Sequence, residues 1–195
     1  ATIDELFTVK KIEGKQAKLL DMTGMAQKGG AVISHLRVAN DIDTIPCARI
    51  GIEQADTVIA CDLVVGSSPD ALAVAGERTT LVVNEDVVPT GEFQTNQSMD
   101  LAPDRFLAAL DRRSTPGKVH CLNAGELASD LLGDAVFTNF VMVGFAAQQG
   151  LLPVSLAAID EALALHGTAV EANRRAVSLG RLAAHDASML EQFGS

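Results

Sequence analysis

Short apolar runs that alternate with helical patterns are the feature that most constrains what this chain can fold into. Four runs have the length and composition of buried strands, at residues 17–22, 57–61, 79–84 and 118–122. One helical pattern begins where Ser68 can cap a helix with Pro69 in its first turn, and it continues over residues 70–75 to Gly76. A second covers residues 103–113. The alternation predicts an α/β fold of three layers, α/β/α, around a mostly parallel sheet.

The last third of the chain has a helical pattern. Asn123 and Glu126 have the spacing of a capping box at a helix start, and so do Thr168 and Glu171. Helices are expected at residues 137–149, 155–166 and 168–186. The first of these is too apolar for a surface helix and should be central, and Gly167 should separate the other two.

Length and charge exclude several classes of protein. A chain of 195 residues predicts one domain, over residues 1–195. The net charge of −10 argues against nucleic acid as a partner, because a phosphate backbone requires clustered Lys and Arg. No apolar stretch reaches the roughly 18 residues of a membrane span, so we expect no membrane partner and a cytoplasmic location. Trp and Tyr are absent, which removes the usual stacking residues for a flavin or a nucleobase.

The cysteines do not form a metal-binding pattern. Cys47, Cys61 and Cys121 are an odd number at wide spacing, without a C-x-x-C pair. We therefore expect buried thiols in a reducing compartment and no metal ligated by this chain.

A glycine-rich segment between two strand patterns is the first candidate site. The segment TGMAQKGG at residues 23–30 precedes a run that alternates at period two over residues 32–38. Glycines allow backbone N–H groups to approach a ligand closely, but an ordinary turn between strands has the same composition. The order of residues matches neither a P-loop nor a G-x-G-x-x-G turn. The candidate residues are Thr23, Gly24, Gln27, Lys28, Gly29 and Gly30 of the loop, with Ser34, His35 and Arg37 of the next strand.

His35 and Asn139 each allow two interpretations, and one catalytic pair, of His120 and Cys121, can be excluded. His35 can be a core histidine or can face a ligand as an acid–base group. His120 and Cys121 are neighbours on a strand and must face opposite sides, so they cannot act as a pair. Asn139, the lone amide of the apolar segment at residues 137–145, either orients a neighbouring loop or faces solvent.

The acidic pairs indicate surface positions. Glu85 and Asp86 follow a strand and are interpreted as solvated turn charges, and Asp160 and Glu161 as charges on a helix surface. No complete catalytic set is found in the chain.

Several segments together carry a resemblance to a known family. AKLLDMTGMAQKGGAVISHLRVA resembles the glycine loop and following strand of the gamma-type domain of 2-oxoacid:ferredoxin oxidoreductases, and the indolepyruvate-type branch is the nearest match. Further resemblance lies in CDLVVGSSPDALAVA, VVNEDVVPTGEF, NFVMVGFAA, AAIDEAL and EANRRAVSLGR. The order and spacing of these segments, over roughly residues 17–185, carry the resemblance.

The resemblance implies a module of a larger oxidoreductase. Such an assembly decarboxylates a 2-oxoacid, here an arylpyruvate, with thiamine diphosphate and Mg²⁺, passes electrons through 4Fe-4S clusters to ferredoxin, and transfers the acyl group to coenzyme A. The chain itself is expected to bind none of these cofactors and to have no activity alone. Its partners would be the other domains of the enzyme, in a symmetric homo-oligomer such as a dimer. By position, the glycine loop with Ser34, His35 and Arg37 would face the substrate or coenzyme A, with Lys28 and Arg37 as cations for phosphate groups.

One departure from the family pattern concerns the start of the chain. Similar proteins begin with a strand and a G-x-G-G-x-G turn, whereas residues 1–16 contain only Gly14. We therefore expect either a fragment of a longer chain or a variant without this turn. Two other functions stay open: a scaffold domain without a ligand role, and an independent nucleotide- or flavin-binding domain, which the missing turn disfavours.

Overall fold

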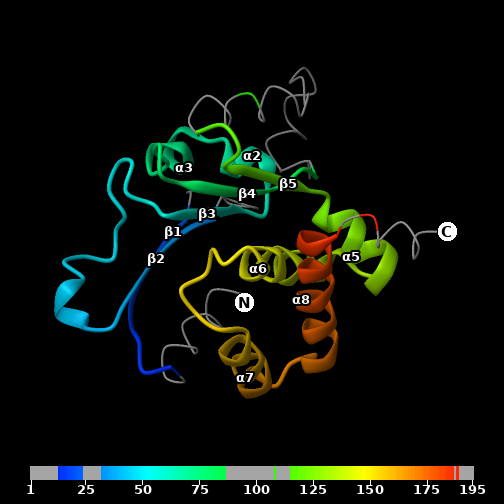
Figure 1. Cartoon of the computed structure of the whole chain (residues 1–195). Helices are drawn as coiled ribbons and strands as arrows, with labels where there is room; N and C mark the ends of the chain where they lie inside the picture. The colour runs from blue at the N-terminus through cyan, green and yellow to red at the C-terminus, as the bar shows by residue number, and fades with distance from the viewer. Residues whose placement is uncertain (1–12, 24–31, 87–107, 109–114, 187, 189–195) are drawn as a thin grey trace.

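The main sheet of the protein is parallel and lies where the apolar runs predict it. The computed structural model describes residues 13–23, 32–86, 108, 115–186 and 188. Three parallel strands form the sheet in the order β3-β4-β5, with β3 at Thr57–Ala60, β4 at Thr80–Asn84 and β5 at Val119–Leu122 (Figure 1). The helix expected at residues 103–113 lies outside the described residues, except for Ala108.

Helices cover both faces of this sheet, which confirms the α/β prediction. Leu81 and Val83 of β4 pack on one face with α2 (Leu63–Gly66) and α3 (Pro69–Ala73). Val82, between them, points to the other face, because side chains alternate along a strand, and it joins a cluster with the C-terminal helices. The layers are visible in Figure 1, with α2 and α3 on one side of the sheet and α5, α6 and α8 on the other.

The start of α3 follows the local sequence, and its end is set by a tertiary contact. The hydroxyl of Ser68 accepts the backbone N–H three residues ahead, as predicted for the N-cap. The helix ends at Ala73, two residues earlier than expected. The reason is that the carbonyl oxygens of Ala73 and Val74 accept the N–H groups of Glu53 and Ala55 from the preceding connection.

The C-terminal third is helical, as the sequence predicts. Its elements are α5 (Ala124–Leu132), a 3-10 turn η2 (Ala135–Phe137), α6 (Thr138–Gln148), α7 (Leu156–His166) and α8 (Val170–His185). Among the helices that the structure describes, none combines the length and apolar character that a membrane crossing requires.

Helix α6 is central, and α8 crosses it at very short range. Seven consecutive residues of α6, 140–146, are buried. At the crossing, a Cβ on Gly144 would lie 2.0 Å from the carbonyl oxygen of Val177, and a Cβ on Gly180 would lie 1.9 Å from that of Val141. Backbone meets backbone at this point, so both positions require glycine.

The start of α8 differs from the prediction of a capping box at Thr168. The N-cap residue is Ala169, in the left-handed region at φ 47°, and no side chain caps the helix. The carbonyl of Thr168 instead accepts the side-chain amide of Asn173, which is buried. The turn between α7 and α8 follows Gly167, which is left-handed as expected at φ 75°.

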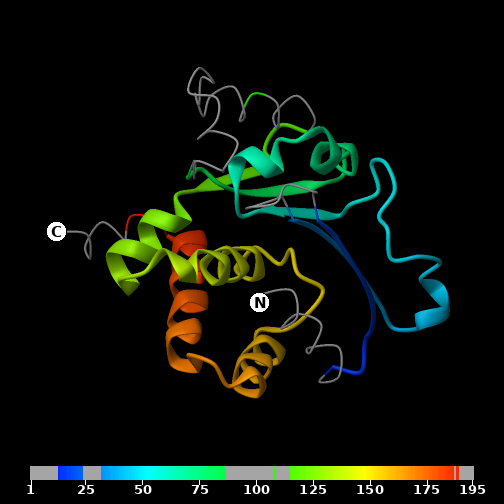
Figure 2. The same ribbon diagram turned by 180° about the vertical axis from the view of Figure 1, so that it is seen from behind.

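The first two strands form a separate antiparallel hairpin. β1 (Gln16–Thr23) pairs with β2 (Val32–Ala39) and with no strand of the main sheet in the described residues. Seen from behind in Figure 2, the hairpin extends at the opposite end of the molecule from α5 and α8. Only Ala17 is buried in β1, so the prediction of a buried strand here is wrong, because the strand does not lie between two helical layers.

Candidate functional site

The hairpin carries the site residues that the sequence predicts. Thr23 and Val32 form its last described pair, so the glycine loop connects this end of the two strands. Gly24, Gln27, Lys28, Gly29 and Gly30 lie outside the described residues.

His35 is a buried histidine that supports a neighbouring loop. Its side chain is 4% exposed, and its Nδ1 accepts the backbone N–H of Ile50 at 2.8 Å. Burial lowers the pKa of the imidazole, and the positive charges of Arg49 and Arg37 lower it further. The ring is therefore neutral at pH 7 with its proton on Nε2, and of the two open interpretations the core histidine is the one observed.

Arg37 holds the same loop as His35. Its guanidinium donates to the carbonyl oxygen of Arg49, at 3.1 Å from Nη2, and to Oε1 of Gln54 at 3.1 Å. Ser34 alternates to the opposite side of the strand and donates to the carboxylate of Asp21 at 2.6 Å. The structure thus brings His35 and Arg37 together against residues 49–54, and places Ser34 away from them.

The hairpin also separates Arg37 from the glycine loop. Arg37 lies five residues along β2 from Val32, which at about 3.4 Å per residue is about 17 Å. A ligand that met both Arg37 and the loop would have to extend along the strand.

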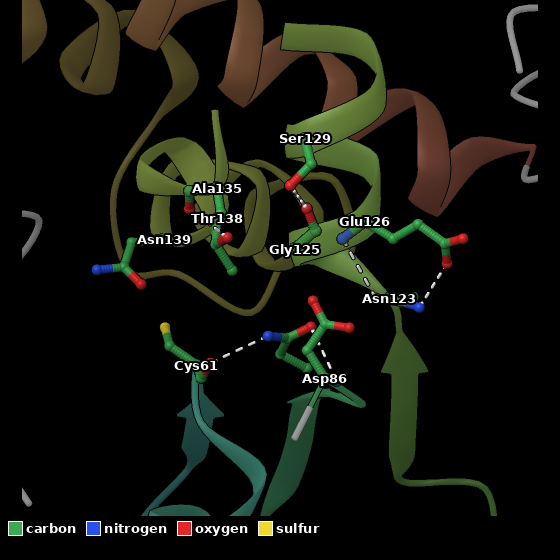
Figure 3. A pocket seen from close by; sticks show the side chains of 10 residues that line it. Cys61, Asp86, Asn123, Gly125, Glu126, Ser129, Ala135, Thr138 and Asn139 are labelled. Atoms are coloured by element: carbon green, nitrogen blue, oxygen red, sulfur yellow. Dashed lines mark hydrogen bonds between the residues drawn. The ribbon is translucent and has the colours of Figure 1, made fainter. Parts of the chain in front are cut away.

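A second candidate site lies at the carboxyl ends of the parallel strands. An open cleft of about 620 Å³ is found there, and its walls come from the ends of all three strands and from the starts of α5 and α6 (Figure 3). Its lining includes Cys61, Asn84, Asp86, Asn123, Gly125 and Asn139. Ligands of open α/β sheets bind beyond the carboxyl ends of the strands, so the cleft is a candidate binding site.

Asn84 joins the elements that form the cleft. It is 2% exposed, and its amide nitrogen donates to the carbonyl of Cys61 at 3.1 Å. Its amide oxygen accepts the N–H of Ala124 at 2.9 Å. One buried side chain at the end of β4 therefore ties the end of β3 to the first residue of α5.

Asp86 lies against the start of α5. A Cβ added to Gly125 would be 1.8 Å from Oδ2 of Asp86, so the carboxylate closely approaches the helix at the one position without a side chain. A carboxylate is favourable at this end of a helix, because the helix dipole is positive there. Asp86 is half-buried in the cleft wall, so its interpretation as a solvated turn charge is wrong.

The three cysteines differ in environment. Burial raises the pKa of the Cys61 thiol to about 11, and the charge of Asp62 adds to the effect. Cys61 is therefore a thiol, not a thiolate, at neutral pH. Cys47 and Cys121 are exposed, which corrects the expectation of buried thiols: Cys47 lies in the irregular connection between β2 and β3, and Cys121 on the last strand of the described sheet.

Two further polar residues have defined positions. His120 points toward α6, with its ring 6.2 Å from that of Phe145, while Cys121 points to the other face, as alternation predicts. Asn139, exposed at the start of α6, is among the residues that line the cleft (Figure 3).

Sequence reasoning missed the cleft although a signal for it exists. Polar residues follow each strand within two positions: Asp62 after β3, Glu85 and Asp86 after β4, and Asn123 after β5. Since the carboxyl ends of parallel strands meet at one edge, these positions must lie near one another.

The described residues do not fit a resident metal centre. They contain no group of three or more metal-ligating side chains. A 4Fe-4S cluster requires four cysteine thiolates, and the whole chain has three cysteines.

The fold and the cleft define an α/β protein with a candidate binding site at the carboxyl ends of a parallel sheet. The particular family follows from a comparison with family models. The model described as pyruvate ferredoxin/flavodoxin oxidoreductase matches residues 4–183, and the chain belongs to this family.

Two solved structures have the same fold. The gamma subunit of keto/oxoacid ferredoxin oxidoreductase from Geobacter sulfurreducens PCA is 18% identical at a TM-score of 0.61, with 93% of this chain and 88% of that chain covered. The PORC subunit of pyruvate oxidoreductase from Thermotoga maritima is 20% identical at a TM-score of 0.59, with 91% and 85% covered. No curated protein sequence matches. The family match confirms the expected family, and the fold is the one found in these gamma and PORC subunits.

Proposed function

We propose that this chain is the gamma-type module of a thiamine-dependent 2-oxoacid:ferredoxin oxidoreductase that converts an arylpyruvate such as indolepyruvate to its acyl-coenzyme A. The match of the family model over residues 4–183 carries the proposal. Thiamine diphosphate, Mg²⁺ and the 4Fe-4S clusters belong to other parts of the assembly, and no step of the chemistry is assigned to residues of this chain. The module works in a cytoplasmic homo-oligomer with ferredoxin as electron acceptor.

The glycine loop is the part of the module that we propose to face coenzyme A. Thr23, which ends β1, and Lys28 would contact one phosphate group. Arg37 would contact another, because it is separated from the glycine loop along the hairpin. The three hydrogen bonds that Arg37 donates to other described residues use Nε and Nη2, and none of them uses Nη1. His35 and Ser34 position the strand and touch no ligand in this proposal.

Reconstitution tests the module function. A related oxidoreductase that lacks its gamma-type module is supplied with this chain, and reduction of an artificial electron acceptor is followed with indolepyruvate and coenzyme A. Return of activity is the expected result. A complex that forms and stays inactive would contradict a working role for the module, and pyruvate used in place of indolepyruvate tests the substrate.

Alanine substitutions test the coenzyme A contact in the reconstituted enzyme. Lys28→Ala and Arg37→Ala should each raise the Michaelis constant for coenzyme A about tenfold with little change in kcat, because each removes a charge-assisted contact. Arg175→Ala, at an exposed position on α8, is the matched control. An unchanged Michaelis constant for coenzyme A in both variants would exclude the contact.

One observation favours a scaffold role as the second candidate. Ser34, His35 and Arg37 all form hydrogen bonds within the hairpin or with residues 49–54. If the hairpin only supports assembly, loop variants will change the amount of complex and leave the turnover of each assembled complex unaltered. Gel filtration of the reconstitution mixtures separates the two candidates.

A further inference from the structure

The cleft at the carboxyl ends of β3, β4 and β5 contains polar groups whose hydrogen-bonding capacity is not used. The carboxylate of Asp86 and the amide of Asn139 form no hydrogen bond among the described residues, and both line the cleft (Figure 3). The amide nitrogen of Asn84 has two hydrogens and donates one, to Cys61. The amide is buried at 2% exposure and lines the cleft, and the described residues provide one hydrogen-bond acceptor for its nitrogen, the carbonyl of Cys61.

These unused groups are a mixture of donors and acceptors. Asp86 can only accept when ionised, the free N–H of Asn84 can only donate, and Asn139 can do both. An anionic ligand is disfavoured, because Asp86 and Glu126 are both in the cleft wall and Asp86 already lies at the start of α5. A cationic ligand would satisfy Asp86 and leave the N–H of Asn84 without an acceptor.

A neutral group that both donates and accepts is complementary to the whole set. We propose that this cleft binds a vicinal diol of the ribose type, with one hydroxyl donating to Asp86 and accepting from Asn84, and the other contacting Asn139. A carboxylate just beyond a parallel strand has this role toward a ribose in other α/β folds. The volume of about 620 Å³ is within the usual range for small-ligand sites. None of the described residues that line the cleft is aromatic, which favours recognition of the sugar over a base.

The inference does not rest on the proposed oxidoreductase function, because binding is measured on the full chain by itself. Side-chain amide signals of Asn84 and Asn139 are followed by NMR during titration with adenosine, methyl β-D-ribofuranoside, 2′-deoxyadenosine and inorganic phosphate. We expect adenosine and the riboside to shift both amides with similar affinity. 2′-Deoxyadenosine should bind about tenfold more weakly, and phosphate should shift neither amide.

Two variants keep the test decisive. Asp86→Asn should weaken adenosine binding about tenfold, because a charge-assisted hydrogen bond is lost. Asn139→Ala, at an exposed position, should weaken binding about threefold without a risk to folding. Asp130→Asn makes the same change of charge at an exposed position on α5 outside the cleft and should have no effect.

Three outcomes would overturn the inference. They are unshifted Asn84 and Asn139 amides at millimolar adenosine, equal affinity for adenosine and 2′-deoxyadenosine, and shifts caused by phosphate but not by the riboside.

Discussion

His35 makes the stability of this protein depend on pH. The folded chain lowers the pKa of the imidazole below the value of about 6.5 that it has in the unfolded chain. Between the two pKa values the unfolded chain binds more protons, so the free energy of unfolding rises with pH in this range. The stability that the neutral ring provides is complete above about pH 6.5 and is lost as the pH falls toward the folded pKa.

Replacement of His35 by Asn tests this dependence. In His35→Asn, Oδ1 takes the position of Nδ1 and can still accept the N–H of Ile50, but the side chain no longer titrates. Urea unfolding between pH 5 and pH 7.5 should show that the wild type loses up to about 1.4 kcal/mol per pH unit relative to the variant below pH 6.5. Ser34→Ala, on the other side of the strand, should keep the wild-type slope. Equal slopes for the wild type and His35→Asn would show that the ring is protonated in the folded chain.

The role of a single residue could be predicted only where the group that it contacts lies close to it in the sequence. The caps formed by Ser68 and Asn123 bond to N–H groups three residues ahead, so their local sequence is sufficient. Asn84 and Asp86 act on residues about forty positions away, Ala124 and Gly125. The sequence describes Asn84 as the end of a strand and Asp86 as a turn charge, and such local descriptions do not contain the contacts that form the cleft.

At the scale of elements, the sequence predicted a strand or a helix where the apolar residues showed a clear pattern over a sufficient length. Strands of four or five residues and helices of eleven show a clear apolar pattern, and they were predicted at their observed places. Helix α2 has four residues, about one turn, so it has no period to detect, and it was not predicted. Gly144 and Gly180, at the crossing of α6 and α8, could not be recognised from the local sequence, because the need for glycine comes from the partner helix.

The crossing of α6 and α8 predicts a strong effect of a single methyl group. Gly180→Ala would place Cβ 1.9 Å from the carbonyl oxygen of Val141, and a backbone atom cannot move aside as a side chain can. Alanine favours an isolated helix over glycine by about 1 kcal/mol, but overpacking costs about 1–3 kcal/mol or more. We expect Gly180→Ala to lower the free energy of unfolding by at least about 2 kcal/mol, measured by urea denaturation.

The same helix provides a control for this substitution. Ser178 is exposed on α8, so Ser178→Ala should stay within about 0.5 kcal/mol of the wild type. Gly144→Ala meets the carbonyl oxygen of Val177 at 2.0 Å and should repeat the loss. A Gly180→Ala protein as stable as the Ser178→Ala protein would mean that the helices cross at a greater distance.

At the scale of the whole molecule, the hairpin and the helical body differ in how they are stabilised. The largest buried cluster joins β4 and β5 to α5, α6, α7 and α8. Among the described residues of the hairpin two are buried, Ala17 and His35, and its hydrogen bonds to residues 45–54 are donated by Lys18 and Arg37 or accepted by His35. Unequal burial of this kind leads to local opening of the less buried part at a lower free energy than global unfolding.

Hydrogen exchange should detect this difference within one chain. We expect the paired amides of β1 and β2 to exchange at a free energy well below that of the amides of β4 and α6, because the hairpin can open while the main core stays folded. Arg37→Ala should lower the opening free energy of the hairpin by about 1–2 kcal/mol through the lost bonds to Arg49 and Gln54, with α6 unchanged. Arg174→Ala, which removes bonds between α8 and α7, should leave the hairpin unaffected. If Arg37→Ala lowers protection in α6 as much as in β2, the hairpin and the body unfold as one unit.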